Sequence, residues 1–243
     1  VNPDSLYTSV TCGNTASQSF TISQTGGGTM FYNISGRDKG ASPYIFEEGF
    51  ESGLGAFSVS PNASTSFASY AVVGGAAKGN SYALASGFSG YLTGLVANIP
   101  ASQPTDISYY VKYNNLNDAY GFVSFTDGST SAANQMYYSR IFNGNLNTYG
   151  TGGTYSFPLN TGQWNFIELK NINWTNRTYD LYINNALASV GLTFNSNTIS
   201  QITNAHIHNT SNYNFSYDDF KVKTTQTSTL NISPSNGVLS SGN

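Results

Sequence analysis

The fold is decided by the stretch Asn160-Thr161-Gly162-Gln163-Trp164-Asn165-Phe166-Ile167-Glu168-Leu169, followed by Thr178-Tyr179-Asp180-Leu181-Tyr182-Ile183-Asn184-Asn185-Ala186-Leu187. In both halves apolar and polar residues alternate, which is typical of β-strands with one buried face. Asn184-Asn185 predicts a tight turn, because Asn tolerates the left-handed backbone that such turns need. We therefore expect a hairpin whose Trp164 and alternating apolar residues enter the core of a β-sandwich.

Short strand patterns continue outside this stretch, and helix signals are nearly absent. Phe67–Val73, Ile107–Tyr113 and Tyr120–Phe125 are rich in aromatic and β-branched residues. Turn residues such as Asp127-Gly128 and Asn143-Gly144 separate the strands. Many short strands with this spacing predict an all-β sandwich or jelly roll.

The opening stretch resembles the Gly-x-Trp hairpin of the concanavalin-A-like, laminin-G-like superfamily, with Asn185 where Gly is usual. The resemblance implies a concanavalin-A-like jelly roll over residues 44–224. It implies no particular activity, because the superfamily includes lectins, hydrolases and purely structural modules.

The two ends of the chain resemble separated parts of one Ig-like (BACON-type) repeat of prokaryotic, including archaeal, surface proteins. The first part occupies residues 1–43, with Phe20-Thr21-Ile22 and Met30-Phe31-Tyr32, and the second occupies residues 225–243, with Leu230-Asn231-Ile232. Such a repeat normally continues with another strand or two. We therefore expect an incomplete Ig-like β-sandwich whose open edge invites a partner strand.

Composition excludes several classes of protein. Only 9% of the residues are charged and the net charge is −3, so we expect no nucleic-acid partner. The single Cys12 excludes an internal disulfide. No apolar run is long enough to span a membrane.

Sequons for N-glycosylation are dense, which predicts an extracellular glycoprotein at the cell surface. They begin at Asn33, Asn62, Asn173, Asn176, Asn209, Asn214 and Asn231.

A second resemblance joins Phe46–Leu54 to Tyr217–Val222. It is to surface jelly rolls and carbohydrate-binding modules, in which carboxylates of the first and last strands can hold a structural Ca²⁺. The resemblance implies ligands from Glu51, Asp218, Asp219 and the Gly79-Asn80 carbonyl, since calcium prefers several oxygen ligands. The alternative is that Glu47, Glu48 and Asp218 are solvent-facing residues of edge strands.

The sequence predicts no enzyme. Retaining glucanases of this fold need paired carboxylates on one strand, and no Glu-x-Asp-x-x-Glu string occurs, while Glu168 and Asp180 stand alone. His206 and His208 flank core-directed Ile207 on one strand face. They could chelate a metal, but with no third ligand signalled we expect a solvated strand face.

These observations predict a non-catalytic structural subunit of a cell-surface filament, sheath or adhesive stalk. Its copies would join by β-strand complementation of the terminal strands. The alternative is a carbohydrate-binding, lectin-like adhesin, with a polysaccharide hydrolase or lyase as a third hypothesis. For sugar contact we expect Tyr109, Tyr137, Tyr149 and Trp174, unless these aromatics belong to the core or the pleated surface.

Overall fold

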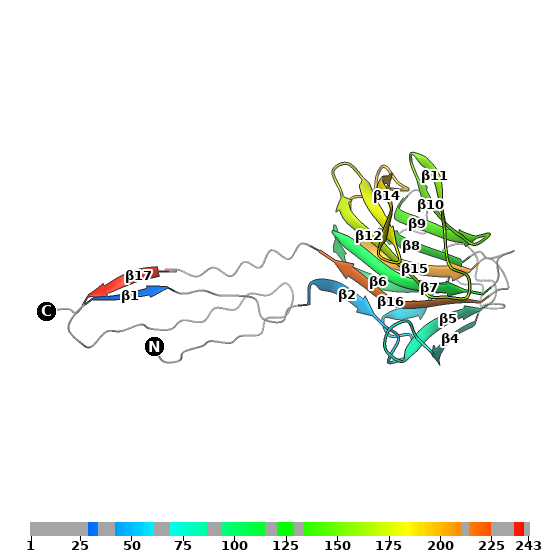
Figure 1. The fold of residues 1–243 in the computed structure, drawn as a ribbon, viewed down its shortest axis with the longest axis horizontal. Coiled ribbons are helices and arrows are strands. Elements are labelled where there is room, and N and C mark those ends of the chain that lie inside the picture. Colours follow the sequence, from blue (N-terminus) through cyan, green and yellow to red (C-terminus); the bar gives the residue numbers. More distant parts are fainter. Residues whose placement is uncertain are drawn as a thin grey trace. The chain divides into compact units, whose positions relative to one another are not determined.

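The computed structural model describes residues 29–33, 42–60, 69–86, 94–114, 121–128, 134–209, 214–224 and 236–240. The chain divides into two compact units, Val1–Ala41 with Thr227–Asn243, and Ser42–Gln226. In the first unit, β1 (Thr29–Asn33) pairs antiparallel with β17 (Asn236–Ser240), so strands from the two ends meet within one chain (Figure 1). The rest of the predicted Ig-like sandwich lies outside the described residues.

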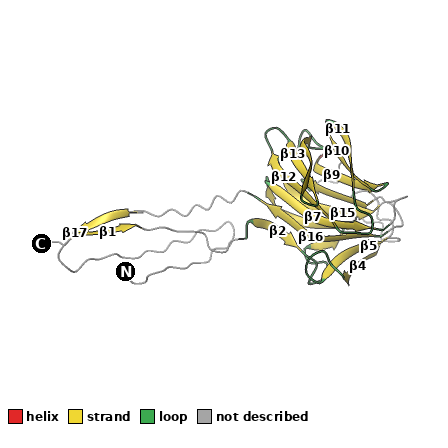
Figure 2. Ribbon diagram, viewed as in Figure 1, coloured by secondary structure: helices red, strands yellow, loops and turns green. Residues whose placement is uncertain are grey.

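The second unit is all-β and contains two antiparallel sheets (Figure 2). The first is a seven-stranded sheet with the order β11-β10-β9-β8-β15-β6-β3. Its strands are β3 (Phe57–Val59), β6 (Leu95–Ser102), β8 (Gly121–Thr126), β9 (Gln135–Phe142), β10 (Asn145–Gly150), β11 (Gly153–Pro158) and β15 (Ile202–Asn209).

The other sheet is eight-stranded, with the order β14-β13-β12-β7-β16-β5-β4 and with β2 paired to β16. Its strands are β2 (Tyr44–Glu48), β4 (Ser69–Gly74), β5 (Ser81–Ser86), β7 (Asp106–Tyr113), β12 (Asn165–Asn173), β13 (Thr178–Ile183), β14 (Ala186–Thr193) and β16 (Phe215–Lys223). The predicted jelly-roll sandwich is confirmed. No helix in the described part of the chain is long and apolar enough to cross a membrane.

The core fills the space between the two sheets, because alternate residues of each strand point inward. On β7, Ile107, Tyr109, Val111 and Tyr113 are all buried, and the residues between them are partly exposed. The ring of Tyr109 stacks on Phe220 of β16 with centroids 5.3 Å apart. The alternation in the sequence therefore determines which side chains of the strand pack between the two sheets.

The hairpin of β13 and β14 has the predicted turn, while Trp164 has another position than expected. Asn184 and Asn185 both have positive φ, 52° and 65°, as a two-residue hairpin turn requires. Trp164 does not enter the core. It is partly exposed, and its ring packs edge to face against Tyr82 on the outer face of the eight-stranded sheet. The expectation was wrong because Trp164 lies two residues before Phe166 and therefore faces outward with it, while the residue between them, Asn165, is the buried one.

A β-bulge interrupts β16. Asp218 lies opposite Tyr110 of β7 and Lys221 lies opposite Ser108, so β16 contains one extra residue here. Asp219 has a φ of 48°. The bulge lets side chains on both sides of it point into the core.

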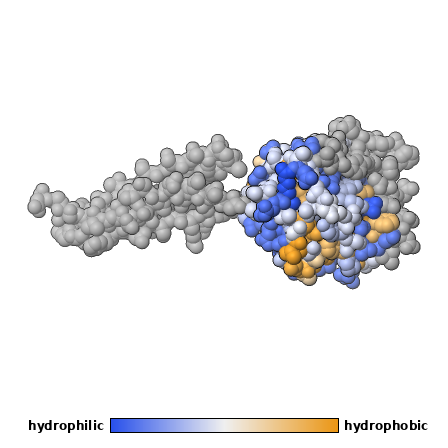
Figure 3. Space-filling view, turned by 90° about the horizontal axis from the view of Figure 1, so that it is seen from above, coloured by the Kyte–Doolittle hydropathy of each residue, from blue (hydrophilic) through white to orange (hydrophobic). Residues whose placement is uncertain are grey.

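The surface of the second unit is mostly polar, with apolar patches (Figure 3). The large apolar side chains with most exposure are Val190 at 67% and Leu187 at 53%, both on the edge strand β14, and Val59 at 42%.

Candidate functional site

The outer face of the seven-stranded sheet holds a cluster of aromatic and hydrogen-bonding side chains. Cross-strand partners share a sheet face, so the strand register defines which residues lie together. One row runs from His206 through Ser124 to Tyr138. The next runs from His208 through Phe122 and Arg140 to Asn147. We call these residues, together with Tyr149, the seven-stranded outer face.

Aromatic rings cross this face from β15 to β10. His208 stacks on Phe122 with centroids 4.4 Å apart, and Phe122 stacks on Tyr138 at 5.5 Å. Tyr138 lies 5.1 Å from Tyr149, and the guanidinium carbon of Arg140 lies 5.7 Å from the Tyr149 ring centroid. Tyr138, Arg140 and Tyr149 are partly exposed, so this side of the face is accessible.

Three hydrogen-bonding atoms on the same face are buried without a partner in the described part of the chain. They are Ser124 Oγ, His206 Nδ1 and Asn147 Nδ2. Ser124 is 0% exposed and His206 is 4% exposed. A buried polar atom without a partner is costly in a folded protein and calls for an explanation. Because these atoms are themselves buried, the accessible part of the face is formed by Tyr138, Arg140 and Tyr149.

The two histidines are buried, so the expectation of a solvated strand face was wrong. Burial lowers the pKa of His206 to about 4. Burial, with a smaller contribution from His206, lowers the pKa of His208 to about 3. Both imidazoles are therefore neutral at physiological pH, and His206 Nε2 lies 3.3 Å from Thr126 Oγ1.

Two of the tyrosines expected to contact sugar belong to the core. Tyr109 and Tyr137 are 1% and 0% exposed, and their hydroxyl oxygens lie 2.9 Å apart between the sheets. Neither can contact a ligand outside the sandwich, so this expectation was wrong. Of the adjacent residues Tyr137 and Tyr138, the outward one is Tyr138. The sequence could have indicated this, because Tyr137 and core-facing Ile141 are an even number of residues apart and therefore share a strand face.

The other two expected sugar contacts have different roles. Tyr149 lies on the seven-stranded outer face, as described above. Trp174 is partly buried, packs edge to face against Phe194 at 5.1 Å, and donates a hydrogen bond from Nε1 to the Pro104 carbonyl at 2.9 Å. Trp174 is therefore a packing residue and not an open platform for a sugar ring.

The residues expected to hold calcium organise one loop. Glu51 Oε1 accepts hydrogen bonds from the backbone N–H groups of Asn80 and Ser81 at 2.7 and 3.1 Å. Mainly through Ser81 and then Asn80, these bonds hold the pKa of Glu51 below its ordinary value. Asp218 Oδ2 accepts from the N–H groups of Ala77 and Lys78 at 2.8 and 2.9 Å. Two carboxylates therefore hold the loop of residues 75–80, Asp218 at its middle and Glu51 at its C-terminal end.

Asp219, the remaining carboxylate, forms an ion pair with Lys221 at 2.9 Å. In the described residues no three histidine, cysteine, aspartate or glutamate side chains gather around one point. Calcium binding at Glu51, Asn80, Asp218 and Asp219 stays a prediction.

The sequons differ in accessibility. Asn173, Asn176 and Asn214 are exposed. Asn209 is 1% exposed, and its Nδ2 donates to the Ala85 carbonyl at 3.1 Å inside the sandwich. A glycan on that nitrogen would not fit the folded domain, so the expectation for Asn209 was wrong. The side chain of Asn33, and Asn62 and Asn231 altogether, lie outside the described residues.

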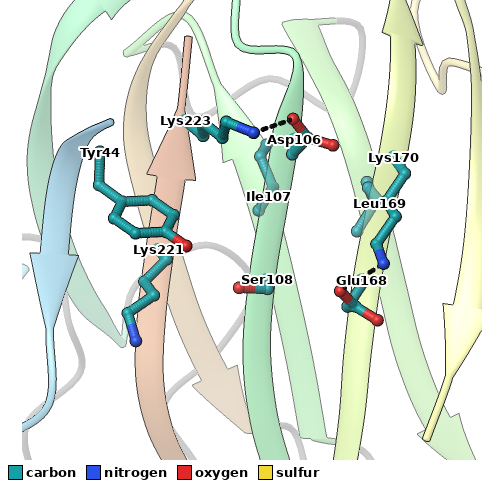
Figure 4. Close-up of a pocket in the computed structure, with 9 residues that line it drawn as sticks. All are labelled: Tyr44, Asp106, Ile107, Ser108, Glu168, Leu169, Lys170, Lys221 and Lys223. Carbon is teal, nitrogen blue, oxygen red and sulfur yellow. Dashed lines mark ion pairs between the residues drawn. The ribbon is translucent and has the colours of Figure 1, made fainter. Parts of the chain in front are cut away.

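A shallow pocket of about 140 Å³ lies on the outer face of the eight-stranded sheet (Figure 4). Its charged side chains neutralise one another, since Lys170 pairs with Glu168 at 2.8 Å and Lys223 pairs with Asp106 at 3.6 Å. Tyr44 and Lys221 line its other side. The paired charges make this pocket a weaker candidate than the seven-stranded outer face.

No family model and no curated protein matches this sequence. Among solved structures it is similar to a sialidase, with a TM-score of 0.56 and 12% identity over 76% of this chain and 19% of the sialidase. It is also similar to a cellulose-induced protein, with a TM-score of 0.54 and 15% identity over 74% of this chain and 97% of that protein. A carbohydrate esterase of a Shiga toxin-encoding bacteriophage gives a TM-score of 0.52 and 12% identity over 75% of this chain and 99% of the esterase. These likenesses show the jelly-roll fold.

Proposed function

We propose that the second unit is a carbohydrate-binding module and that its site is the seven-stranded outer face. The observation that carries the proposal is the cluster of partly exposed side chains Tyr138, Arg140 and Tyr149, in which the two tyrosine rings lie 5.1 Å apart and the Arg140 guanidinium carbon lies 5.7 Å from the Tyr149 ring centroid. Tyrosine rings offer apolar faces to the C–H groups of a sugar. Arg140, which is also partly exposed, can donate hydrogen bonds to its hydroxyl groups. Two of the similar structures, the sialidase and the esterase, are named for carbohydrate substrates, which fits the proposal.

The test is binding of cellulose, xylan and mannan oligosaccharides, measured by calorimetry. Tyr149→Ala and Tyr138→Ala should each weaken binding by roughly tenfold, since a ring contact contributes about 1–2 kcal/mol. Tyr182→Ala is the matched control, because Tyr182 is equally half-exposed but lies on the other sheet. The proposal fails if no oligosaccharide binds, or if Tyr182→Ala weakens binding as much as Tyr149→Ala.

The proposal does not include catalysis. Glycoside hydrolysis generally uses two carboxylates. Neither of the two cross-strand rows that define the seven-stranded outer face contains an Asp or a Glu. Release of reducing ends from any bound oligosaccharide would contradict this part of the proposal.

Filament assembly at an extracellular surface is a second, finer proposal. Its support is the pairing of β1 with β17, which brings strands from both chain ends into one sheet, where a further strand could add. Native mass measurement tests it. A monomer at all concentrations would contradict strand donation, and glycan analysis of protein from its natural source would test the exposed sequons at Asn173, Asn176 and Asn214.

A further inference from the structure

A cluster of aromatic and cationic side chains lies on the outer face of the eight-stranded sheet, on the opposite side of the sandwich from the seven-stranded outer face. We call it the cation–aromatic patch. It consists of Lys78, Tyr82, Tyr110, Lys112, Trp164 and Phe166. Trp164 packs edge to face against Tyr82 with centroids 5.2 Å apart. Tyr110 stacks on Phe166 at 4.5 Å, and Tyr110 and Lys112 are both outward residues of β7.

The two lysines of the patch lie against its rings. Lys112 Nζ is 4.8 Å from the Trp164 ring centroid and 5.2 Å from that of Tyr82. Lys78 Nζ is 5.7 Å from the Tyr110 centroid. These contacts hold each ammonium group at the sheet surface by cation–π attraction, and they leave its charge uncompensated.

The charges of the patch contrast with those of the neighbouring pocket. Lys170, Lys221 and Lys223 each form an ion pair with a carboxylate. Lys78 and Lys112 form none within the described residues. The acidic residue opposite Tyr110 is Asp218, but it is fully buried and its Oδ2 accepts backbone N–H groups. In a chain with a net charge of −3, the patch is therefore a local surface that attracts anions.

We propose that the cation–aromatic patch binds an anionic polysaccharide, a chain that carries carboxylate or sulfate groups. Half-buried aromatic rings on a sheet surface can pack against the apolar faces of successive sugar units. Lys78 and Lys112 supply two positive charges for the acidic groups. This site is separate from the seven-stranded outer face and does not depend on it.

The burial of the rings argues against an anionic membrane as the ligand. Tyr82, Tyr110, Trp164 and Phe166 are all of intermediate exposure. Insertion into a bilayer interface requires protruding apolar side chains, and the patch contributes none of the largely exposed ones. A polysaccharide needs only contact with the ring faces and the ammonium groups.

Affinity electrophoresis and calorimetry with polygalacturonate and dextran sulfate test the proposal, with dextran as the uncharged control. We expect the protein to bind at least one of the two polyanions, and we expect added salt to weaken that binding. Lys112→Met and Lys78→Met, which keep most of the side-chain volume, should each weaken binding by roughly threefold to tenfold. Trp164→Leu should weaken it by a similar factor. Lys223→Met is the matched control, because it removes one positive charge from the same sheet face outside the patch.

The outcomes separate the ligands and the sites. Equal loss in Lys223→Met and Lys112→Met would overturn the proposal, because the attraction would then be a general effect of charge. Binding to vesicles of phosphatidylserine and phosphatidylcholine but to neither polyanion would also overturn it. Tyr149→Ala should leave polyanion binding unchanged, and loss in that variant would assign the polyanion to the other sheet. Failure of neutral oligosaccharides to bind would affect only the seven-stranded outer face.

Discussion

His206 and His208 should make the fold less stable in acid. Both imidazoles are neutral in the folded protein, with pKa values of about 4 and 3, whereas in the unfolded chain they titrate near pH 6.5. Their contribution is fully present above about pH 6.5 and is lost as pH falls toward the folded pKa values, because only the unfolded chain takes up protons there. The free energy of unfolding should fall by up to about 1.4 kcal/mol per pH unit for each histidine.

Denaturant unfolding at pH 7, 6, 5 and 4.5 measures this slope. His208→Phe keeps a flat ring against Phe122 and removes one titrating group, so its stability should fall less steeply than that of the wild type. Parallel curves for the two proteins would mean that His208 does not control the acid response.

Gly121 lies where β8 approaches the ring of Phe215, and a Cβ at this position would overlap that ring. Gly121→Ala should therefore lower the free energy of unfolding by about 1–3 kcal/mol, the usual cost of overpacking a core. Gly49→Ala is the control, since its Cβ would meet only Glu51 Cγ at 4.0 Å. Equal free energies of unfolding for the two variants would show that the Phe215 ring can move to make room for the added Cβ.

At the scale of elements, Asp218 ties β16 to the loop of residues 75–80. Burial raises the pKa of its carboxyl, so the ionised form costs stability at neutral pH, while Oδ2 accepts two N–H groups. Asp218→Asn keeps an acceptor without the charge and should melt at or above the wild-type midpoint at pH 7. Asp218→Ala leaves the N–H groups of Ala77 and Lys78 without their acceptor and should cost about 1–3 kcal/mol.

Thermal melting with and without a calcium chelator completes this experiment. If Asp218→Asn melts as low as Asp218→Ala, and if the chelator lowers the wild-type midpoint to the same value, the negative charge itself is needed. That result would support the calcium prediction, because an ion bound only to the folded state raises its stability.

The sequence predicted where the strands lie but not which way every side chain faces. β7 and β8 were found within one residue of their observed bounds, because alternation and turn residues are local signals. The facing of Trp164 and the burial of His206 and His208 depend on register and on neighbouring strands. In the adjacent pair Tyr137-Tyr138, one ring lies in the core and the other on the surface, so an error of one residue in assigning the inward face reverses the two roles.

At the scale of the molecule, the hydrophobic core that the structure describes lies in the second unit. Its buried apolar residues extend from Phe46 to Val222. A fragment of residues 42–226 should therefore fold alone, with a thermal midpoint within a few degrees of the full chain. Failure of the fragment to give a cooperative melt would show that the terminal segments stabilise the sandwich.

The edge strand β14 is the part of the unit most prone to self-association. It carries no charged residue, and Leu187 and Val190 are exposed, whereas natural edge strands are usually protected by charge. Leu187→Lys with Val190→Lys should reduce self-association in sedimentation velocity. Ser58→Lys on β3, an edge strand of the other sheet, is the control and should have a smaller effect.

The bulge in β16 makes the strand respond unequally to deletions in its gene. Loss of the single codon for Asp219 would remove the extra residue between Asp218 and Lys221 and leave Tyr217 and Phe220 both facing inward. Loss of the codon for Lys221 would instead turn Val222 outward and send Lys223 into the core. Both deletions keep the reading frame, but only the first leaves the remaining side chains of the strand on their original faces of the sheet.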